Sequence, residues 1–222
     1  LNLFHLDATC PLVSKIHREV EILEKYNFKI IMIGHKFHPE VIGTIGQAKN
    51  KENIILVEDV KDVEALDFKK NQKIAYVTQT TLSVYDTSSI VKAIKEKFPD
   101  VTEPKKSDIC YATSNRQLSV QELAKKVEAF YVIGANNSSN SVRLVETAKL
   151  FGSPHALLVQ NIDDFDFQAL KHYKNIGLTA SASAPEELIR KFVSKLEENF
   201  SITINDQKIP ENVKFKVPNF LN

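Results

Sequence analysis

The sequence has almost no net charge and no long apolar run, and these two absences exclude several classes of protein. Its 222 residues include 29 lysines and arginines against 28 aspartates and glutamates, a net charge of +1. This balance gives no electrostatic reason to expect binding to nucleic acid or to an anionic membrane. No apolar run approaches the roughly 20 residues of a membrane span, and residues 1–7 do not resemble a signal peptide. We therefore expect a globular protein of the cytoplasm.

Cysteine is also scarce, and the two cysteines occupy equivalent positions in a repeat. Cys10 and Cys110 each lie 24 residues before a glycine that ends an apolar run, Gly34 and Gly134. A period of about 100 residues is much longer than that of a solenoid, so it indicates duplicated domains. Two thiols brought to the same position by two modules suggest a shared metal centre. The alternative is a pair of unrelated buried thiols.

The alternation of amphipathic and apolar segments predicts the fold class. Strands that alternate with helices favour small parallel sheets with right-handed crossovers. We therefore predict an α/β fold with two similar small parallel-sheet modules and a C-terminal tail. The expected helices are 12–26, a short one after His38-Pro39, 89–98, 120–127, 142–151 and 186–196, and the expected strands are 3–6, 28–33, 54–57, 74–77, 130–133, 156–159, 176–178 and 213–217.

Small polar side chains gather where the expected strands end and the next helices begin. In parallel sheets ligands bind at these carboxyl ends, and the free N–H groups of a helix N-terminus suit phosphate. Ser138, Ser139, Asn140 and Ser183 lie at such positions. They are candidate anion-binding residues, although serine and asparagine are also ordinary helix caps.

The two modules carry different kinds of polar side chain at equivalent positions of the repeat. His38 and Glu40 stand 4 and 6 residues after the first module's glycine, and Ser138 and Asn140 stand 4 and 6 residues after the second's. An imidazole and an acid in one copy, with neutral anion binders in the other, would suit a ligand that has a reacting end and a phosphate end. Cysteines at helix N-termini have stabilised thiolates. Two thiolates complete no common four-ligand iron or zinc site, so at least one ligand must come from outside this sequence.

Six motifs follow one another along the chain: Asp7-Ala-Thr-Cys-Pro-Leu-Val13, Gly34-His-Lys-Phe-His-Pro-Glu-Val41, Thr78-Gln-Thr-Thr-Leu-Ser83, Asp108-Ile-Cys-Tyr-Ala-Thr113, Asn137-Ser-Ser-Asn-Ser141 and Ser183-Ala-Pro-Glu186. In this order they resemble the 4-hydroxy-3-methylbut-2-enyl diphosphate reductase family, whose members catalyse the last step of the methylerythritol phosphate route to isoprenoids. The resemblance runs from about Leu6 to the C-terminus, and six motifs in the right order are far more specific than any one alone.

The resemblance implies a three-module fold of pseudo-three-fold symmetry around a central iron–sulfur cluster, with one cysteine from each module. This chain resembles modules two and three, so we expect an N-terminally truncated protein without the first module. The implied division is 1–10 for the end of the missing first module and a cluster-ligand segment, 11–106 and 107–196 for modules two and three, and 197–222 for the tail. Ser181 stands where the family usually has glycine, which puts the local backbone geometry in question.

The resemblance also implies a cofactor, partners and roles. A 4Fe–4S cluster would be held by Cys10, Cys110 and a third cysteine absent from this chain, with its fourth iron open to the substrate hydroxyl. Ferredoxin or flavodoxin would supply electrons, and the allylic diphosphate would become isopentenyl and dimethylallyl diphosphate with loss of water. Glu40 would be the proton source, acting through Thr80 and His38, which also contact the substrate. The diphosphate would be bound by Ser138, Ser139, Asn140 and Ser183.

Two other hypotheses stay open at this point. The chain could be a folded remnant that assembles no cluster, since a ligand is missing. It could also be an α/β protein that binds a phosphate-bearing ligand, its cysteines being buried and without a redox role. In either case His38 and Glu40 would simply begin a helix.

Overall fold

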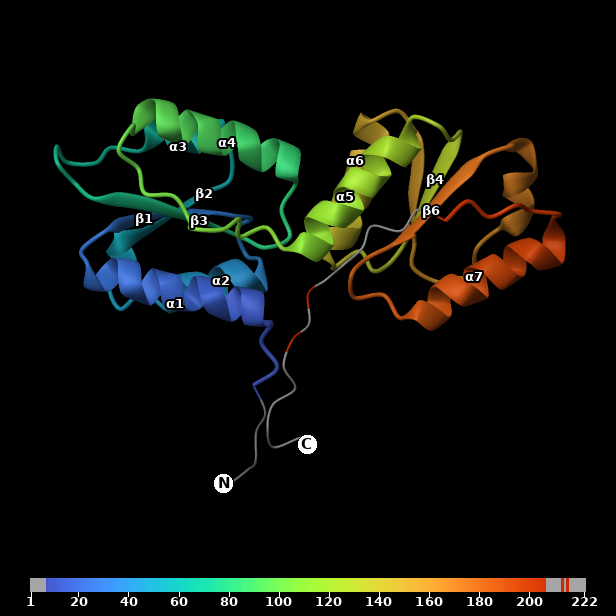
Figure 1. Ribbon diagram of the computed structural model, residues 1–222, viewed down its shortest axis with the longest axis horizontal. Coiled ribbons are helices and arrows are strands. Elements are labelled where there is room, and N and C mark those ends of the chain that lie inside the picture. Colours follow the sequence, from blue (N-terminus) through green and yellow to red (C-terminus); the bar gives the residue numbers. More distant parts are fainter. Residues whose placement is uncertain (1–6, 207–212, 214, 216–222) are drawn as a thin grey trace, which may run out of the picture. The chain divides into compact units, whose positions relative to one another are not determined.

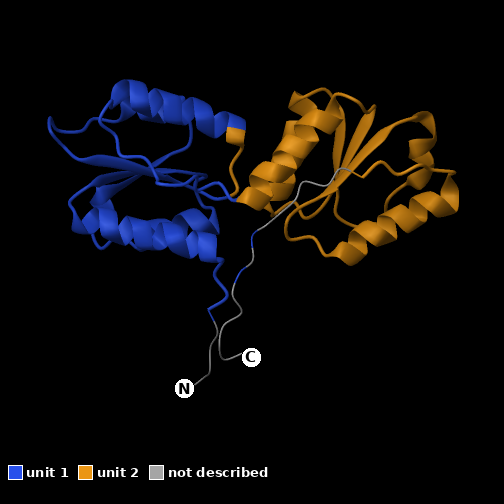
Figure 2. Ribbon diagram, in the orientation of Figure 1, with its two compact units in different colours: residues 1–80, 85–110, 211–222 blue, residues 81–84, 111–210 orange. Residues whose placement is uncertain are grey.

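Two three-stranded parallel sheets organise the chain. The computed structural model describes residues 7–206, 213 and 215, which fall into two units (Figure 2): residues 7–80, 85–110, 213 and 215, then residues 81–84 and 111–206. Each unit contains one sheet with helices around it, which confirms the predicted α/β class with two similar modules. The strand expected at 3–6 lies outside the described residues, and the one at 213–217 lies largely outside them.

In the first unit the central strand is β1, and the strand order is β2-β1-β3 with all strands parallel. Helices α1 and α2 cover one face of this sheet, and α3 and α4 cover the other (Figure 1). Pro11 suits the first turn of α1, where its missing N–H is not needed. The bounds are α1 Pro11–Lys25, β1 Lys29–Ile33, α2 Pro39–Gly46, the 3-10 turn Lys51–Asn53, β2 Ile54–Val57, α3 Val60–Ala65, β3 Ile74–Thr78 and α4 Val84–Lys97.

The core of the first unit forms around β1, which is buried on both faces. Ile30 and Met32 point to one face and pack with Ile16 and Val20, which lie one turn apart on α1. A strand covered on both faces reads as a continuous apolar run, which is why the sequence Lys29–Ile33 does not alternate. The packing of α1 therefore fixes where its N-terminus, next to Cys10, lies relative to the sheet.

The second unit repeats this plan with the order β5-β4-β6. Phe130 and Val132 of β4 pack against α5 and α6 on one face, and Tyr131 packs with Phe165 and Phe192 on the face that α7 covers (Figure 1). None of the described helices in either unit is long and apolar enough to cross a membrane. The bounds are α5 Tyr111–Ala124, β4 Ala129–Ile133, α6 Ser139–Leu150, β5 His155–Val159, the 3-10 segment Phe167–His172, β6 Ile176–Ala180 and α7 Glu186–Asn199.

One predicted helix boundary was wrong by nine residues. The expected helix 120–127 begins instead at Tyr111 as α5 and ends at Ala124. The reason is that polar residues, Thr113 and Gln117, occupy buried positions on the face that α5 turns to the core. Without apolar side chains there, the first half of the helix has no visible hydrophobic period. Helix α4 also begins earlier than expected, at Val84, and α3 was not anticipated.

The repeat extends to the packing around Gly34 and Gly134. Each glycine follows the central strand and donates its N–H to the last residue of the neighbouring strand, Val57 or Val159, at 3.1 Å. Each also faces the residue seven positions later on the following helix. A Cβ built on Gly34 would lie 2.6 Å from Cγ2 of Val41, and one on Gly134 would clash with Ser141. Glycine thus lets both helices approach the strand end closely.

We predict that Gly34→Ala and Gly134→Ala each lower the free energy of unfolding by about 1–3 kcal/mol, the usual cost of overpacking a filled core. Val41 and Ser141 are buried and cannot move aside freely. The matched control is Gly46→Ala, since a Cβ there meets nothing within 4 Å and alanine favours a helix by roughly 0.5–1 kcal/mol. Denaturant titration of the three variants measures the effect. Equal stability of Gly34→Ala and Gly46→Ala would contradict the close-approach explanation.

Candidate functional site

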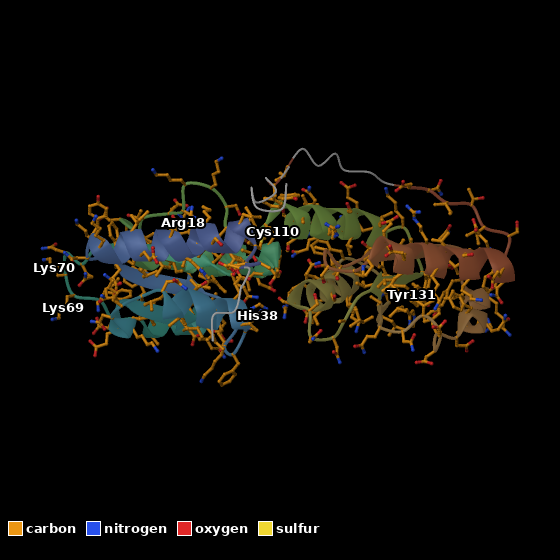
Figure 3. The ribbon with its side chains drawn as sticks, turned by 90° about the horizontal axis from the view of Figure 1, so that it is seen from below. Arg18, His38, Lys69, Lys70, Cys110 and Tyr131 are labelled. Carbon is orange, nitrogen blue, oxygen red and sulfur yellow. The ribbon has the colours of Figure 1, made fainter. Side chains whose placement is uncertain are left out.

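The catalytic candidates of the first unit lie at the carboxyl end of its sheet. His38 is the N-cap of α2, Glu40 lies in the first turn of that helix, and Thr80 follows the end of β3 by two residues. Figure 3 shows His38 and Cys110 at this end of the unit, opposite Lys69 and Lys70, which precede β3. Parallel strands bring such segments to one edge because they all finish on the same side.

Glu40 is bound through both carboxylate oxygens to one residue. The Thr80 backbone N–H donates to Oε1 at 2.7 Å and the Thr80 hydroxyl donates to Oε2 at 2.9 Å. Burial raises the pKa of Glu40, the two bonds from Thr80 oppose that rise, and nearby Asp108 adds to it. A carboxyl group whose pKa is moved up toward neutrality is better suited to donate a proton than an ordinary exposed glutamate.

The hydrogen bonding of His38 indicates which ring nitrogen carries its proton. The Glu40 backbone N–H donates to Nδ1 at 3.2 Å, so Nδ1 is an acceptor and the neutral ring has its hydrogen on Nε2. Burial lowers the pKa of His38, and the neighbouring His35 lowers it further. The side chain therefore presents a neutral N–H donor beside a carboxyl group with a raised pKa.

Thr80 also connects the acid to one of the cysteines. Its carbonyl accepts from the backbone N–H of Cys110 at 3.0 Å, while its N–H and hydroxyl both bind Glu40. Thr80 itself is 5% exposed. A single buried residue thus holds the carboxyl group and the thiol-bearing segment in a defined arrangement.

Asp108 links the same segment to the helix that follows the other cysteine. Its carboxylate accepts from Lys15 of α1 at 2.8 Å and from the backbone N–H of Thr78 at 3.0 Å. Lys15 lies just over one turn beyond Cys10, and Asp108 lies two residues before Cys110. The side chain of Asp108 is fully buried. Removing one partner from such a pair would leave an uncompensated buried charge.

Neither Cys10 nor Cys110 forms a disulfide within the described residues, and the first is exposed while the second is half-buried. Each directly precedes a helix, α1 or α5. Soft thiolate ligands of this kind suit iron–sulfur clusters or zinc. Among the described residues no group of three or more His, Cys, Asp or Glu side chains could hold a metal ion. The two thiols fit a cluster as part of its ligand set.

In the second unit the three candidate residues at the start of α6 have three different environments. Ser138 is the N-cap of α6, and its hydroxyl accepts from the N–H of Ser141. Ser139 donates its hydroxyl to the carbonyl of Thr81 at 3.1 Å. Asn140 is buried, yet within the described structure both of its amide atoms lack a hydrogen-bond partner. A buried amide without partners is costly and suggests that something else binds there.

The fourth candidate of this unit, Ser183, pairs with Ser181. Their hydroxyl oxygens are 3.2 Å apart, and the N–H of Ser181 donates to the carbonyl of Ile133 at 2.9 Å. The non-glycine residues with positive φ in the described chain are Asn27, Phe37 and Asn71, so Ser181 has an ordinary backbone conformation. A side chain is therefore tolerated where the resembled family usually has glycine.

Several residues that shape the site were not predicted as site residues. In the first unit, Gln79 is fully buried and its Oε1 accepts from the N–H of His35 at 3.0 Å. There too, Asp108 binds Lys15 and the backbone N–H of Thr78. In the second unit, Arg116 and Gln117 bind backbone carbonyl groups. Gln79 and Asp108 fall inside the motifs that carry the resemblance, next to Thr80 and two residues before Cys110. Their position in the sequence could therefore have identified them. Lys15 and Asp108 are 93 residues apart, and no local pattern indicates that they pair.

Comparison with known proteins points to one family. Residues 1–197 match the family described as LytB protein. The 4-hydroxy-3-methylbut-2-enyl diphosphate reductases of Cereibacter sphaeroides and Roseobacter denitrificans are 46% and 47% identical over 221 residues, which cover 99% of this chain and 69% and 70% of those proteins. The solved E-1-hydroxy-2-methyl-but-2-enyl-4-diphosphate reductase of Plasmodium falciparum has a TM-score of 0.90 at 41% identity, covering 97% of this chain and 68% of that one.

The cap at His38 predicts a pH dependence of stability. Because the pKa of His38 in the folded chain lies below its usual 6.5, the unfolded chain binds the proton first as the pH falls below 6.5. The stabilisation is therefore complete above pH 6.5 and is lost as the pH falls toward the folded-state pKa. His38→Asn keeps a capping acceptor but cannot titrate, so its free energy of unfolding should fall less between pH 7.5 and 5.5. We expect a difference of about 0.5 kcal/mol, since the ring is half-exposed.

Denaturant titration at the two pH values measures this difference. Identical pH dependence in the wild type and His38→Asn would show that Nδ1 of His38 does not act as the cap.

Proposed function

This chain belongs to the LytB protein family, and on that premise we propose which of its residues perform each part of the family's reaction. The chain carries the reductase function of isoprenoid biosynthesis named for its relatives, the reduction of 4-hydroxy-3-methylbut-2-enyl diphosphate. The reaction breaks an allylic C–O bond, consumes two electrons and two protons, and releases water with isopentenyl or dimethylallyl diphosphate. A protein that performs it needs an electron source, a positioned acid and a site for the diphosphate.

The observation that carries the assignment is the position of Thr80 between Glu40 and Cys110. Its N–H and hydroxyl bind the carboxyl group, and its carbonyl binds the N–H of Cys110. A reductive C–O cleavage needs a proton at the place where electrons arrive. An acid and an electron-carrier ligand bound to the same buried residue meet that need, whereas a chain that only bound phosphate would have no use for the link.

We propose that Cys10 and Cys110 are two of the ligands of a 4Fe–4S cluster. Neither cysteine forms a disulfide within the described residues, and both directly precede a helix, a position that suits a thiolate ligand. The sequence has two cysteines, so a third thiolate must come from another part of the complete enzyme. The chemistry that such a cluster supplies when bound is one-electron transfer to the substrate. Ferredoxin or flavodoxin, small one-electron carriers, would be the donor.

Glu40 is the proposed proton source. Its raised pKa keeps the carboxyl proton available nearer to neutral pH, and the Thr80 hydroxyl lies 2.9 Å from it and can pass a proton onward. The Nε2–H of His38 gives a second donor at the same helix start, since Nδ1 is occupied by the cap. Together these three residues can bind the reacting end of the substrate and deliver a proton to the departing oxygen.

The proposed diphosphate site is in the second unit. Ser138 and Ser139 offer hydroxyls and N–H groups at the start of α6, where the helix dipole favours an anion. The unpartnered amide of Asn140 can donate to a phosphate oxygen. Ser183 can donate its hydroxyl to the same anion while accepting from Ser181, 3.2 Å away. A phosphate oxygen only accepts hydrogen bonds, so Ser181 would be the donor in this pair.

The cluster assignment predicts how the chain responds to iron. Reconstituted anaerobically with iron and sulfide, it should hold well under the roughly four irons of a complete cluster, because two thiolates leave the metal under-ligated. Cys10→Ser or Cys110→Ser should lower the iron content further. Joined to a family module that brings the third cysteine, the chain should give a brown, oxygen-sensitive protein. Colorimetric iron analysis and absorption spectra measure this, and a full cluster in the chain alone would disprove the three-cysteine assignment.

The assignment of Glu40 predicts a split between turnover and binding in that joined enzyme. Glu40→Gln keeps the size of the side chain but cannot release a proton, so kcat should fall at least about 10²-fold with little change in KM. Asn140→Ala removes a proposed diphosphate donor and should raise KM first. Steady-state kinetics with a chemical reductant measure both variants. Near-normal kcat in Glu40→Gln, with affinity alone reduced, would make Glu40 a binding or capping residue.

A further inference from the structure

Helix α5 begins directly after Cys110, and two consecutive side chains on it bind the backbone of two different loops. Arg116 binds the end of β6, and Gln117 binds the turn that follows Thr81. Neither residue belongs to the acid, thiol or anion-binding groups described above. The two loops that they bind, however, carry or contact residues of those groups. All of these contacts lie within the second unit.

Gln117 closes the turn at residues 82–84 with both ends of its amide. Nε2 donates to the carbonyl of Leu82 at 2.8 Å, and Oε1 accepts from the N–H of Val84 at 2.9 Å. The side chain is 1% exposed, so these bonds do not compete with water. Thr81, one residue before the turn, accepts the hydroxyl of Ser139. Gln117 therefore fixes the backbone against which Ser139 is oriented.

Arg116 performs the same task for the other loop. Nε donates to the carbonyl of Ala180, the last residue of β6, at 3.2 Å, and Nη1 donates to the carbonyl of Ala112 at 3.0 Å. Ser181 follows Ala180 directly, and its hydroxyl pairs with that of Ser183. The guanidinium thus bridges the first turn of α5 and the base of the loop that carries Ser183.

Adjacent residues on a helix point about 100° apart, so they can reach two different loops from one rigid element. Anion-binding hydroxyls on loops lose affinity if the loops must be ordered on binding, and anchoring them beforehand removes that cost. We propose that Arg116 and Gln117 are positioning residues, which hold the turn that contacts Ser139 and the loop that carries Ser183 on the helix that follows the proposed cluster ligand Cys110. This inference rests on the proposed diphosphate site.

Two separate measurements on this chain test the proposal. One follows the hydrogen exchange of the two loops, and the other follows the affinity for the anion. The variants are Gln117→Met and Arg116→Met, which remove the hydrogen bonds and keep much of the volume, with Gln117→Glu and Arg116→Lys as milder forms. The matched control is Glu128→Gln. Glu128 also binds backbone N–H groups of the segment joined to β6, at Lys174 and Asn175, but at the opposite end of the strand.

The first measurement is amide hydrogen exchange. Gln117→Met should speed exchange about 3- to 10-fold or more at residues 81–84, and Arg116→Met should do so at 181–184, the effect of losing one or two net hydrogen bonds. Glu128→Gln should leave both loops unchanged while lowering thermal stability. Gln117→Glu, which keeps the acceptor for Val84, and Arg116→Lys, which keeps one charged donor, should give intermediate rates.

The second measurement is the affinity for inorganic diphosphate, followed by NMR titration at a temperature where every variant is folded. Both methionine variants should bind about 3- to 10-fold more weakly than wild type. Arg116→Lys should recover part of that loss, and Glu128→Gln should bind like wild type. Equal affinity in wild type and the methionine variants, or an equal loss in Glu128→Gln, overturns the positioning role.

The proposed diphosphate site and the positioning role are overturned by different results. If the wild-type chain shows no shifts at residues 138–140 and 183 with inorganic diphosphate, the proposed diphosphate site is wrong, and the positioning role, which needs that site, is overturned with it. If wild type binds and the loops exchange at wild-type rates in the methionine variants, the diphosphate site stands and only the positioning role is overturned.

Discussion

The close approach of a helix to a strand end at a glycine is the constraint on which both units depend. At Gly34 and Gly134 the absent Cβ lets Val41 and Ser141 reach the backbone, which draws the start of α2 or α6 down onto the sheet. Gln79, which follows β3, and Ser181, which follows β6, lie against the same glycines from the other side. Each donates its backbone N–H to the last residue of the central strand. Every candidate residue outside the cysteines lies within a few residues of these contacts.

One packing arrangement thus produces two chemistries because the cap positions differ. His38 and Ser138 are both N-caps, and Glu40 and Asn140 are both the second residue of the helix that follows. The backbone places each pair equivalently, so two substitutions separate the pair that we propose for proton delivery from the pair that we propose for the anion. A carboxylate at the second position of α6 would repel an anion, and an amide at that position of α2 could not donate a proton.

Much of the fold could be predicted from the sequence because the strands and the duplication depend on local patterns of residues. The apolar runs predicted all six described strands, and the equal spacing of the two cysteines from their glycines predicted the duplicated plan that the sheet orders confirm. The parts that failed depend on contacts between distant segments. Helix α5 begins nine residues before its predicted start. The prediction failed because Thr113 and Gln117 are polar but buried, so this part of the helix shows no hydrophobic period in the sequence. The pairing of Lys15 with Asp108 joins residues 93 positions apart.

The same distinction explains why the proposed site residues were easier to predict than the residues that hold the neighbouring backbone. Glu40, Ser138 and Asn140 stand at helix starts, where a polar side chain after an apolar strand is conspicuous. Gln117 and Asp108 are polar but buried, and their partners are backbone groups of Leu82, Val84 and Thr78, which the sequence does not identify. A buried polar side chain is costly unless it is hydrogen-bonded, so these bonds also hold the backbone segments that they join in one conformation. In the first unit that segment is the end of β3 at Thr78, two residues before Thr80, and in the second it is the turn at residues 82–84 that follows Thr81.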